Sequence, residues 1–177
     1  MRILLCHSYY RQRGGEDFSF EQEAEMLEAR GHQIRRLTPH NRQAEDLSRV
    51  SLALKTIWNR GLAKELRAAM REFKPEIVPF TNTFPMISLA AYYAAKAEGA
   101  AVVQSVRNYR FICPRATMFR DGRDCTRCLH AMTPWPAVAL SCYRDRVSSA
   151  LLASQIVVHR LLRSWQRKVD LFYSPSG

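Results

Sequence analysis

The sequence lacks any long hydrophobic run and any recognisable leader. No window of its 177 residues approaches 18 uninterrupted apolar positions, so a transmembrane helix is not expected. Met1 leads straight into an apolar segment, without the basic region, apolar region and small-residue cleavage site of a signal peptide. We therefore expect a cytoplasmic protein. With 47% hydrophobic residues, the chain is long enough for one domain with a full core.

Acidic residues are also few, because 16 Asp and Glu stand against 27 Lys and Arg, a net charge of +11. The basic residues are scattered through the predicted helices, as on an ordinary solvated surface. Anionic lipid headgroups and nucleic acid are the partners that such a charge would attract. The sequence contains neither an RNA-binding motif of interleaved aromatics nor a zinc finger with a helix-borne histidine pair. We therefore expect no nucleic-acid partner, and contact with an anionic membrane surface, the inner face of the plasma membrane, stays open.

Apolar strands and helical segments alternate along most of the chain. Strands are predicted at 2–6, 33–37, 76–80, 101–106 and 170–173. Helices are predicted from Glu16 to the break at Gly31, over 44–73 with a break at 59–61, over 87–98 and over 147–168. This alternation with short links predicts an α/β fold, a Rossmann-like three-layer sandwich with a mainly parallel sheet.

The stretch 107–144 breaks this alternation and is rich in cysteine and proline, which predicts an irregular insertion that contains the cysteines. The long helix that follows carries apolar residues that we expect in the core. They are Val157, Leu161, Leu162 and Trp165. The sequence then stops at 174–177, where a domain of this type normally continues into another helix. We therefore expect that it is part of a longer protein.

A polar loop, 7–13, separates the first predicted strand from Gly14 and Gly15 at the mouth of a helix. Without a Cβ, such a pair lets an anionic ligand approach the backbone N–H groups of a helix N-terminus, which is partially positive. A tight turn is the commoner meaning of two glycines. Glu16 and Asp17 are typical of a helix N-terminus and are less expected to act as a general base.

Other polar and aromatic residues follow the predicted strands at their carboxyl ends, where open α/β sheets bind ligands. The candidate ligand contacts are His7, Tyr9, Asn82, Thr83, Phe84, Asn108, Tyr109 and Arg110. The alternatives are loop packing for His7 and Tyr9, and loop capping for the residues that follow the third and fourth strands.

Four of the five cysteines lie in or beside the predicted insertion. Cys125 and Cys128 form a C-x2-C pair after the turn signal Asp121–Gly122, and Cys113 and Cys142 flank the pair. A cytoplasmic chain does not depend on disulfides, so this spacing predicts a structural zinc site with four thiolate ligands.

The alternative to zinc is a set of reduced, partly buried thiols, or a disulfide formed after purification. His130 is a substitute ligand should one cysteine point away. Cys6, inside the first predicted strand, is expected to be a buried and inert thiol.

Several short motifs occur together in one protein family in the same order. They are 1–5 (MRILL), 14–17 (GGED), 27–32 (LEARGH), 82–85 (NTFP), 92–96 (YYAAK), 108–110 (NYR) and 113–114 (CP). On these motifs the sequence resembles, over nearly all its length, the N-terminal half of bacterial family 4 retaining glycosyltransferases with the GT-B fold. The combination is far more specific than any one motif.

The resemblance implies that residues 1–177 are a single N-terminal Rossmann-like domain, which takes a glycan or lipid-linked acceptor. A C-terminal domain, absent from this chain, would bind most of the nucleotide-sugar donor, so this chain alone is expected to be inactive. The resemblance also implies a cleft that includes Gly14, Gly15, Glu16 and Arg107, with the glycines near the donor diphosphate. No catalytic metal is expected, since basic side chains and helix dipoles stabilise the departing phosphate. No catalytic carboxylate is assigned.

Two positions depart from the family's pattern. Relatives carry histidines in a His-x-His-Asn pattern at the end of the third strand, where this sequence has Pro79, Phe80, Thr81 and Asn82. They also carry a cleft histidine where this sequence has Arg107, a permanent cation that accepts no hydrogen bond. Arg107 can still clamp a phosphate or a carboxylate. The alternative is a non-catalytic, truncated or degenerate module that binds a glycan or a partner.

Overall fold

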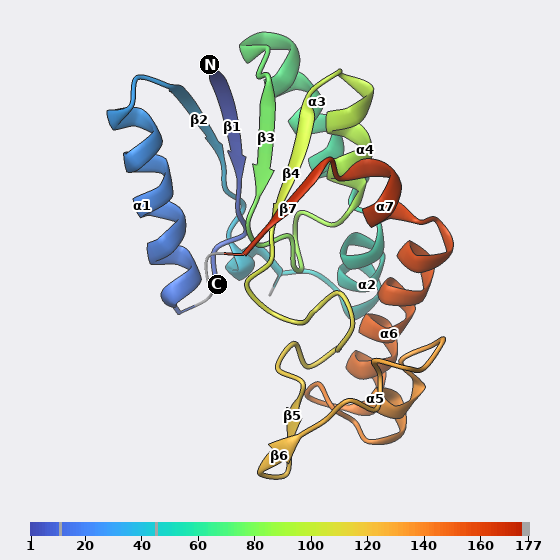
Figure 1. The fold of residues 1–177 in the computed structure, drawn as a ribbon. Helices are drawn as coiled ribbons and strands as arrows, with labels where there is room; N and C mark the ends of the chain where they lie inside the picture. The colour runs from blue at the N-terminus through green and yellow to red at the C-terminus, as the bar shows by residue number, and fades with distance from the viewer. Residues whose placement is uncertain (11, 45, 175–177) are drawn as a thin grey trace. The chain divides into compact units, whose positions relative to one another are not determined.

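Five parallel strands form one sheet, which confirms the α/β, Rossmann-like fold class expected from the sequence (Figure 1). The computed structural model describes residues 1–10, 12–44 and 46–174. In spatial order the strands are β2 (Gln33–Leu37), β1 (Arg2–Cys6), β3 (Ile77–Phe80), β4 (Ala101–Ser105) and β7 (Leu171–Tyr173). Each pair of neighbours is parallel, and each strand lies within a residue or two of its predicted position.

Helices cover both faces of the sheet because neighbouring residues of each strand point to opposite sides. Ile3 and Leu5 of β1 pack in one apolar cluster with Phe20 and Ala24 of α1 (Gly15–Ala29). The other strand residues, such as Leu4 of β1, pack on the opposite face against α3 (Arg60–Phe73) and α4 (Ala90–Ala97). Figure 1 shows α1 on one side of the sheet and α3 and α4 on the other. The result is the predicted three-layer arrangement.

The chain divides into two compact units. The first, which we call the sheet unit, comprises 1–107 and the segment from Ser164 onward. The second, 108–163, is the cysteine unit. It contains β5 (Phe119–Arg120), β6 (Arg123–Asp124), α5 (Trp135–Ala139) and α6 (Arg146–Leu161). The cysteine unit therefore extends beyond the irregular segment predicted at 107–144 and takes in α6. Of the chain end discussed above, 175–177 lie outside the described residues.

The single helix predicted over 147–168 is wrong, because two helices occupy that stretch. α6 ends at Leu161, and α7 begins at Ser164 and ends at Lys168. Arg163 between them has a left-handed backbone with φ of 51°, which interrupts the helical hydrogen-bond ladder. The buried Ser164 hydroxyl lies 2.9 Å from the hydroxyl of Tyr93 on α4, which fixes where α7 starts.

Only part of the apolar stripe expected on that helix is in the core. Trp165 packs against the sheet core, as predicted. Leu161 and Leu162 are 78% and 43% exposed, so the prediction that they lie in the core is wrong. The break at Arg163 separates α6 from α7, and a helical periodicity read across 147–168 therefore combines residues of two different helices.

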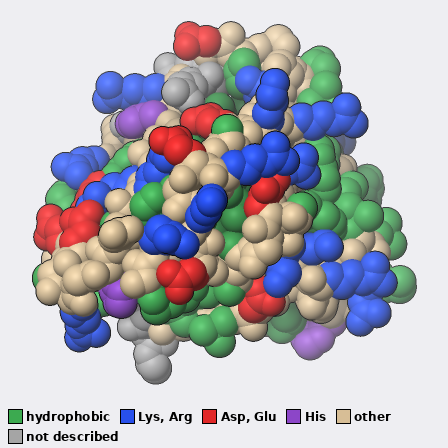
Figure 2. Space-filling model, turned by 90° about the horizontal axis from the view of Figure 1, so that it is seen from above, with side chains coloured by type: hydrophobic (Ala, Val, Ile, Leu, Met, Phe, Trp, Pro, Cys, Tyr) green, Lys and Arg blue, Asp and Glu red, His purple; other side chains and the backbone are tan. Residues whose placement is uncertain are grey.

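Some of the exposed basic side chains are paired with acidic side chains. Arg71 lies 2.9 Å from Glu98, and Lys96 lies 2.8 Å from Asp170. On the face shown in Figure 2, Lys and Arg are interspersed with Asp and Glu. Such exposed pairs contribute little to stability, but they divide the positive charge into small areas. Among the described residues, no helix is long and apolar enough to cross a membrane.

Asn59, at the predicted break between two helices, connects the start of α3 to the loop that contains Met86 and Ser88. It separates α2 (Arg49–Ile57) from α3, and its Oδ1 accepts a hydrogen bond from the N–H of Leu62, which caps α3. Its Nδ2 donates to the carbonyl of Met86, and its own N–H donates to the hydroxyl of Ser88. Asn59 is 5% exposed, so these groups have little access to water.

We predict that Asn59→Ala destabilises the protein by about 2–4 kcal/mol. The change removes a helix cap, worth about 1 kcal/mol, and leaves the buried Met86 carbonyl without its donor, at about 1–3 kcal/mol. Urea unfolding followed by circular dichroism measures this loss. The control is Ser48→Ala, which removes only the exposed cap of α2 and is expected to lower stability by about 1 kcal/mol. Equal losses of stability in the two variants would mean that Asn59 acts only as a helix cap.

Candidate functional site

The strand order places a ligand-binding position at the carboxyl ends of β1 and β3. The chain runs from β1 to β2 on one side, and then to β3 and β4 on the other, so the order reverses between β1 and β3. Open α/β sheets bind ligands at such a switch point, because the loops that follow the two strands diverge there. The loops after Cys6 and Phe80 are tied to each other: Ser8 N–H donates to the Asn82 carbonyl at 2.9 Å, and the Asn82 amide donates to the Ser8 carbonyl at 2.7 Å.

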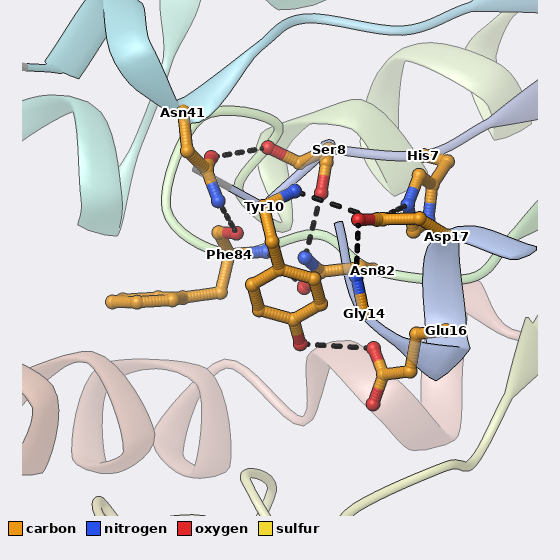
Figure 3. A network of polar contacts seen from close by, with 9 residues as sticks. All are labelled: His7, Ser8, Tyr10, Gly14, Glu16, Asp17, Asn41, Asn82 and Phe84. Atoms are coloured by element: carbon orange, nitrogen blue, oxygen red, sulfur yellow. Dashed lines mark hydrogen bonds and ion pairs between the residues drawn. The ribbon is translucent and has the colours of Figure 1, made fainter. Parts of the chain in front are cut away.

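A buried carboxylate, that of Asp17, organises the loop between β1 and α1 (Figure 3). One oxygen, Oδ1, lies 2.7 Å from Nε2 of His7 and accepts a longer bond, 3.4 Å, from the N–H of Tyr10. The other oxygen accepts a hydrogen bond from the N–H of Gly14 at 3.1 Å. Asp17 therefore does more than the N-terminal capping expected of it, because it holds both ends of the loop that starts at His7.

His7 is fully buried and neutral at physiological pH. Its ring stacks on Phe20, with 4.6 Å between centroids, and meets Tyr9 edge-on. Burial lowers the pKa of His7, and this outweighs the opposing effect of the hydrogen bond with Asp17. Because a carboxylate accepts at Nε2, the proton of the neutral ring is on Nε2. Nδ1 is then an acceptor, and it has no hydrogen-bond partner within the described residues.

Gly14 and Gly15 stand at the start of α1 without any constraint that demands glycine. Neither has a positive φ, and a Cβ placed on either would meet nothing within 4 Å. A tight turn that requires glycine is therefore absent at these two positions. Gly15 is exposed, and as the first residue of α1 its N–H has no partner within the described residues. The adjacent Arg13 is also exposed, and its guanidinium lies 5.2 Å from the ring centroid of Phe18.

Arg107 follows β4 and is bound to acceptors of its own chain. Its side chain is 8% exposed and donates to the carboxylate of Glu23 on α1, at 3.1 Å, and to the hydroxyl of Ser105. The hydroxyl of Tyr173 donates to the other oxygen of Glu23 at 2.6 Å. Arg107 does clamp a carboxylate, as its chemistry suggests, but an internal one.

The remaining candidates lie in three different settings. Asn82 is buried, and its Oδ1 accepts from the N–H of Phe84, so its side chain is used within the loops. Tyr9 and Thr83 are half-buried, and the hydroxyl of Tyr10 donates to Glu16 at 2.9 Å. The three residues 108–110 open the cysteine unit: Asn108 Oδ1 accepts from the N–H of Arg110, while Tyr109 is 54% exposed.

Several residues of the network were not predicted as part of a site. Ser8 donates from its hydroxyl to Asn41 at 2.6 Å, and the Asn41 amide approaches the Phe84 carbonyl at 3.5 Å. Glu23 was also missed, because it reads as one more polar residue on the outer face of α1. A signal was present at Ser8, a small polar residue in the loop that follows a buried strand. Nothing in the local sequence singles out Asn41 or Glu23, because their partners are distant along the chain.

Comparisons with known proteins do not identify a family for this chain. No protein-family model matches the sequence. The chain is 26% identical over 165 residues to an uncharacterized 42.6 kDa protein in the cps region of Klebsiella pneumoniae, and the match covers 76% of this chain. It spans only 44% of the length of that relative. Among solved structures, the UDP-GlcNAc 2-epimerase from Methanocaldococcus jannaschii aligns at 12% identity and a TM-score of 0.46, over 97% of this chain and 45% of the epimerase.

We predict that the free energy of unfolding falls as the pH is lowered below about 6.5, the ordinary pKa of histidine. The folded state holds His7 with a lowered pKa, so in this range the unfolded chain binds more protons than the folded chain, and acid favours unfolding. The stabilisation is present above pH 6.5 and is lost as the pH falls toward the pKa of the folded state. Denaturant titrations between pH 7.5 and 5.5 measure the slope.

His7→Gln should flatten this slope because glutamine does not titrate, and it should also lower stability at pH 7.5 by about 0.5–1.5 kcal/mol because the ring that stacks on Phe20 is lost. The matched control is His130→Gln, at an exposed position of the cysteine unit, which should keep both the slope and the stability. An unchanged slope in His7→Gln would mean that another group causes the acid sensitivity.

Proposed function

We propose that this chain is the acceptor-side domain of a glycosyltransferase in polysaccharide biosynthesis, part of an enzyme that moves a sugar from a nucleotide-sugar to a glycan or lipid-linked acceptor. The observation that carries the proposal is the glycine pair at the switch point. Gly14 and Gly15 lie where open α/β sheets bind ligands, and neither the backbone nor the packing requires glycine there. The remaining reason for glycine at these positions is that it leaves the backbone accessible to a ligand.

The electrostatics of this position suit a phosphate group. The N-terminus of α1 is partially positive, and the Gly15 N–H projects from its first turn. Arg13 adds an exposed cation beside the glycines. The carboxylate of Asp17 is buried and already accepts hydrogen bonds from its own loop, so it braces the glycines rather than presenting its oxygens to a ligand.

The similarity to a protein of the Klebsiella pneumoniae cps region supports the biosynthetic setting. The ordered motifs of the sequence support glycosyl transfer in particular, because they resemble those of family 4 glycosyltransferases along nearly the whole chain. In an enzyme of that kind a second domain binds most of the donor, and this chain supplies the acceptor side together with the glycine loop. Metal-independent phosphate stabilisation by Arg13 and the helix dipole belongs to the same proposal.

One observation favours a second candidate, a glycan- or partner-binding module without catalysis. Arg107 stands where the resemblance expects a cleft histidine, and its guanidinium is bound to Glu23 and Ser105. A guanidinium held in this way cannot act as the neutral donor and acceptor that a histidine provides. In that case the carboxyl ends of β1 and β3 would still bind a sugar, and no glycosyl transfer would follow.

We predict that Gly15→Leu abolishes most of the sugar transfer while leaving the fold intact. A side chain at this exposed position blocks a phosphate from the first turn of α1, so kcat/KM should fall about tenfold or more. Stability should be unchanged or slightly higher, because glycine is about 1 kcal/mol worse than most residues in a helix. The assay measures sugar transfer by the protein encoded by the longest reading frame that contains this sequence. A panel of nucleotide-sugars serves as donors, and lipid-linked glycans serve as acceptors.

The control is Gly61→Leu, also an exposed glycine in the first turn of a helix, α3, but away from the switch point. It should retain full activity. Full activity in Gly15→Leu would remove the glycine loop from the donor site. Saturable glycan binding without transfer by any nucleotide-sugar would instead establish the second candidate.

A further inference from the structure

The cysteine unit has little apolar core. Within the described residues, both apolar clusters belong to the sheet unit. The cysteine unit buries Val138, Leu152 and Ile156, its other buried apolar residues are alanines and one cysteine, and Met132 and Trp135 are 94% and 66% exposed. A segment of this size needs more than such a core, and small units of this kind are commonly held by a disulfide or a metal.

All four cysteines of the unit line one pocket, although they come from three separate stretches of the chain. The lining thiols belong to Cys113, Cys125, Cys128 and Cys142. All four are free cysteines. Turns aim them there: the N–H of Cys113 donates to the Tyr109 carbonyl at 2.7 Å, and the N–H of Cys142 donates to the Ala137 carbonyl at 2.9 Å.

The C-x2-C pair stands on a short antiparallel hairpin. β5 and β6 are joined by Asp121 and Gly122, which both have positive φ, the geometry of a tight two-residue hairpin turn. At the end of the hairpin the N–H of Cys125 donates to the Met118 carbonyl at 2.7 Å. The next turn, from Thr126 to Leu129, brings Cys128 back to the same pocket. A hairpin followed by C-x2-C supplies two ligands from one rigid element.

The charges around the pocket suit an anionic metal–thiolate centre. Arg115 and Arg120 both line it, and the guanidinium of Arg120 lies 3.2 Å from Sγ of Cys142. Four thiolates in one pocket would repel one another, and a bound divalent cation would neutralise that repulsion.

We propose that the four thiols that line this pocket bind one structural zinc ion. Four thiols each lose a proton, and the four sulfurs donate electron pairs to Zn²⁺, which gives a tetrahedral centre with a net charge of −2 and releases four protons. No oxidant or reductant is needed. Within the described part of the chain, no three histidine, cysteine or acidic side chains already form a ligand set, so the thiols must close around the ion. His130 is exposed and does not line the pocket, so it takes no part.

The experiment is metal analysis of the whole 177-residue chain, purified in reductant and then freed of loosely bound metal. We expect about one equivalent of zinc, and, after exchange for Co²⁺, the visible absorption of tetrahedral thiolate coordination. Cys125→Ser should reduce the bound metal severalfold, whereas Cys6→Ser, the matched control in β1, should leave it unchanged. Well under one equivalent in the unaltered chain, or a Co²⁺ complex without thiolate bands, would overturn the proposal.

Chelation of the unaltered chain tests the structural role without any substitution. Hydrogen exchange should increase in 108–163 while the strands of the sheet unit keep their protection. A metal-free protein with the cysteine unit equally protected would contradict the structural role. Mass spectrometry of unreduced protein that shows a disulfide among these four cysteines, with no zinc bound, would replace the metal by a covalent link.

Discussion

The hydrogen bonds of the Asp17 carboxylate are the constraint on which the candidate site depends. They fix the loop that connects β1 to α1 at both ends, through His7 and Gly14. A fully buried carboxylate is tolerated only when its oxygens are satisfied, and the N-terminus of α1 adds its partial positive charge. The position of the glycine pair thus follows from the hydrogen bonds of the buried Asp17 carboxylate with His7 and Gly14. His7, a candidate for ligand contact from the sequence, acts in the structure as a partner of that carboxylate.

Most of the sheet unit was predictable because its signals are local and repeated. The strands other than β2 (QIRRL) are short, mainly apolar runs, and alternation with helices is sufficient to predict a parallel sheet. The failure at 147–168 has a physical cause. The break at Arg163 has no glycine or proline to mark it, and the restart of the helix depends on a bond between Ser164 and Tyr93, residues far apart in the sequence. Tertiary contacts of this kind leave no periodic trace.

The position of the candidate site could be predicted more reliably than the roles of its residues. Strand ends and a glycine pair indicate the edge of the sheet, and both follow from local sequence. Whether a polar residue there faces a ligand or a neighbour depends on long-range pairing. Arg107 illustrates this, because its chemistry suits an anion, and only the fold reveals that Glu23 supplies one. The Asn82 amide likewise donates to the Ser8 carbonyl, in the loop after β1. Gly14 and Gly15 are the exception, because neither their backbone conformation nor their packing requires glycine.

The two units satisfy their polar groups by different means. In the sheet unit, the charge of Asp17 is balanced from within by backbone N–H groups, an imidazole and a helix N-terminus, and the imidazole stacks on Phe20 of an apolar cluster. In the cysteine unit, four thiols share one pocket, where Arg120 bonds to one of them, and few large apolar side chains are buried. Thiols offer weak hydrogen bonds to one another, so their clustering stabilises little by itself. A cation from solution is the partner that would turn this cluster from a weak contact into the element that orders the unit.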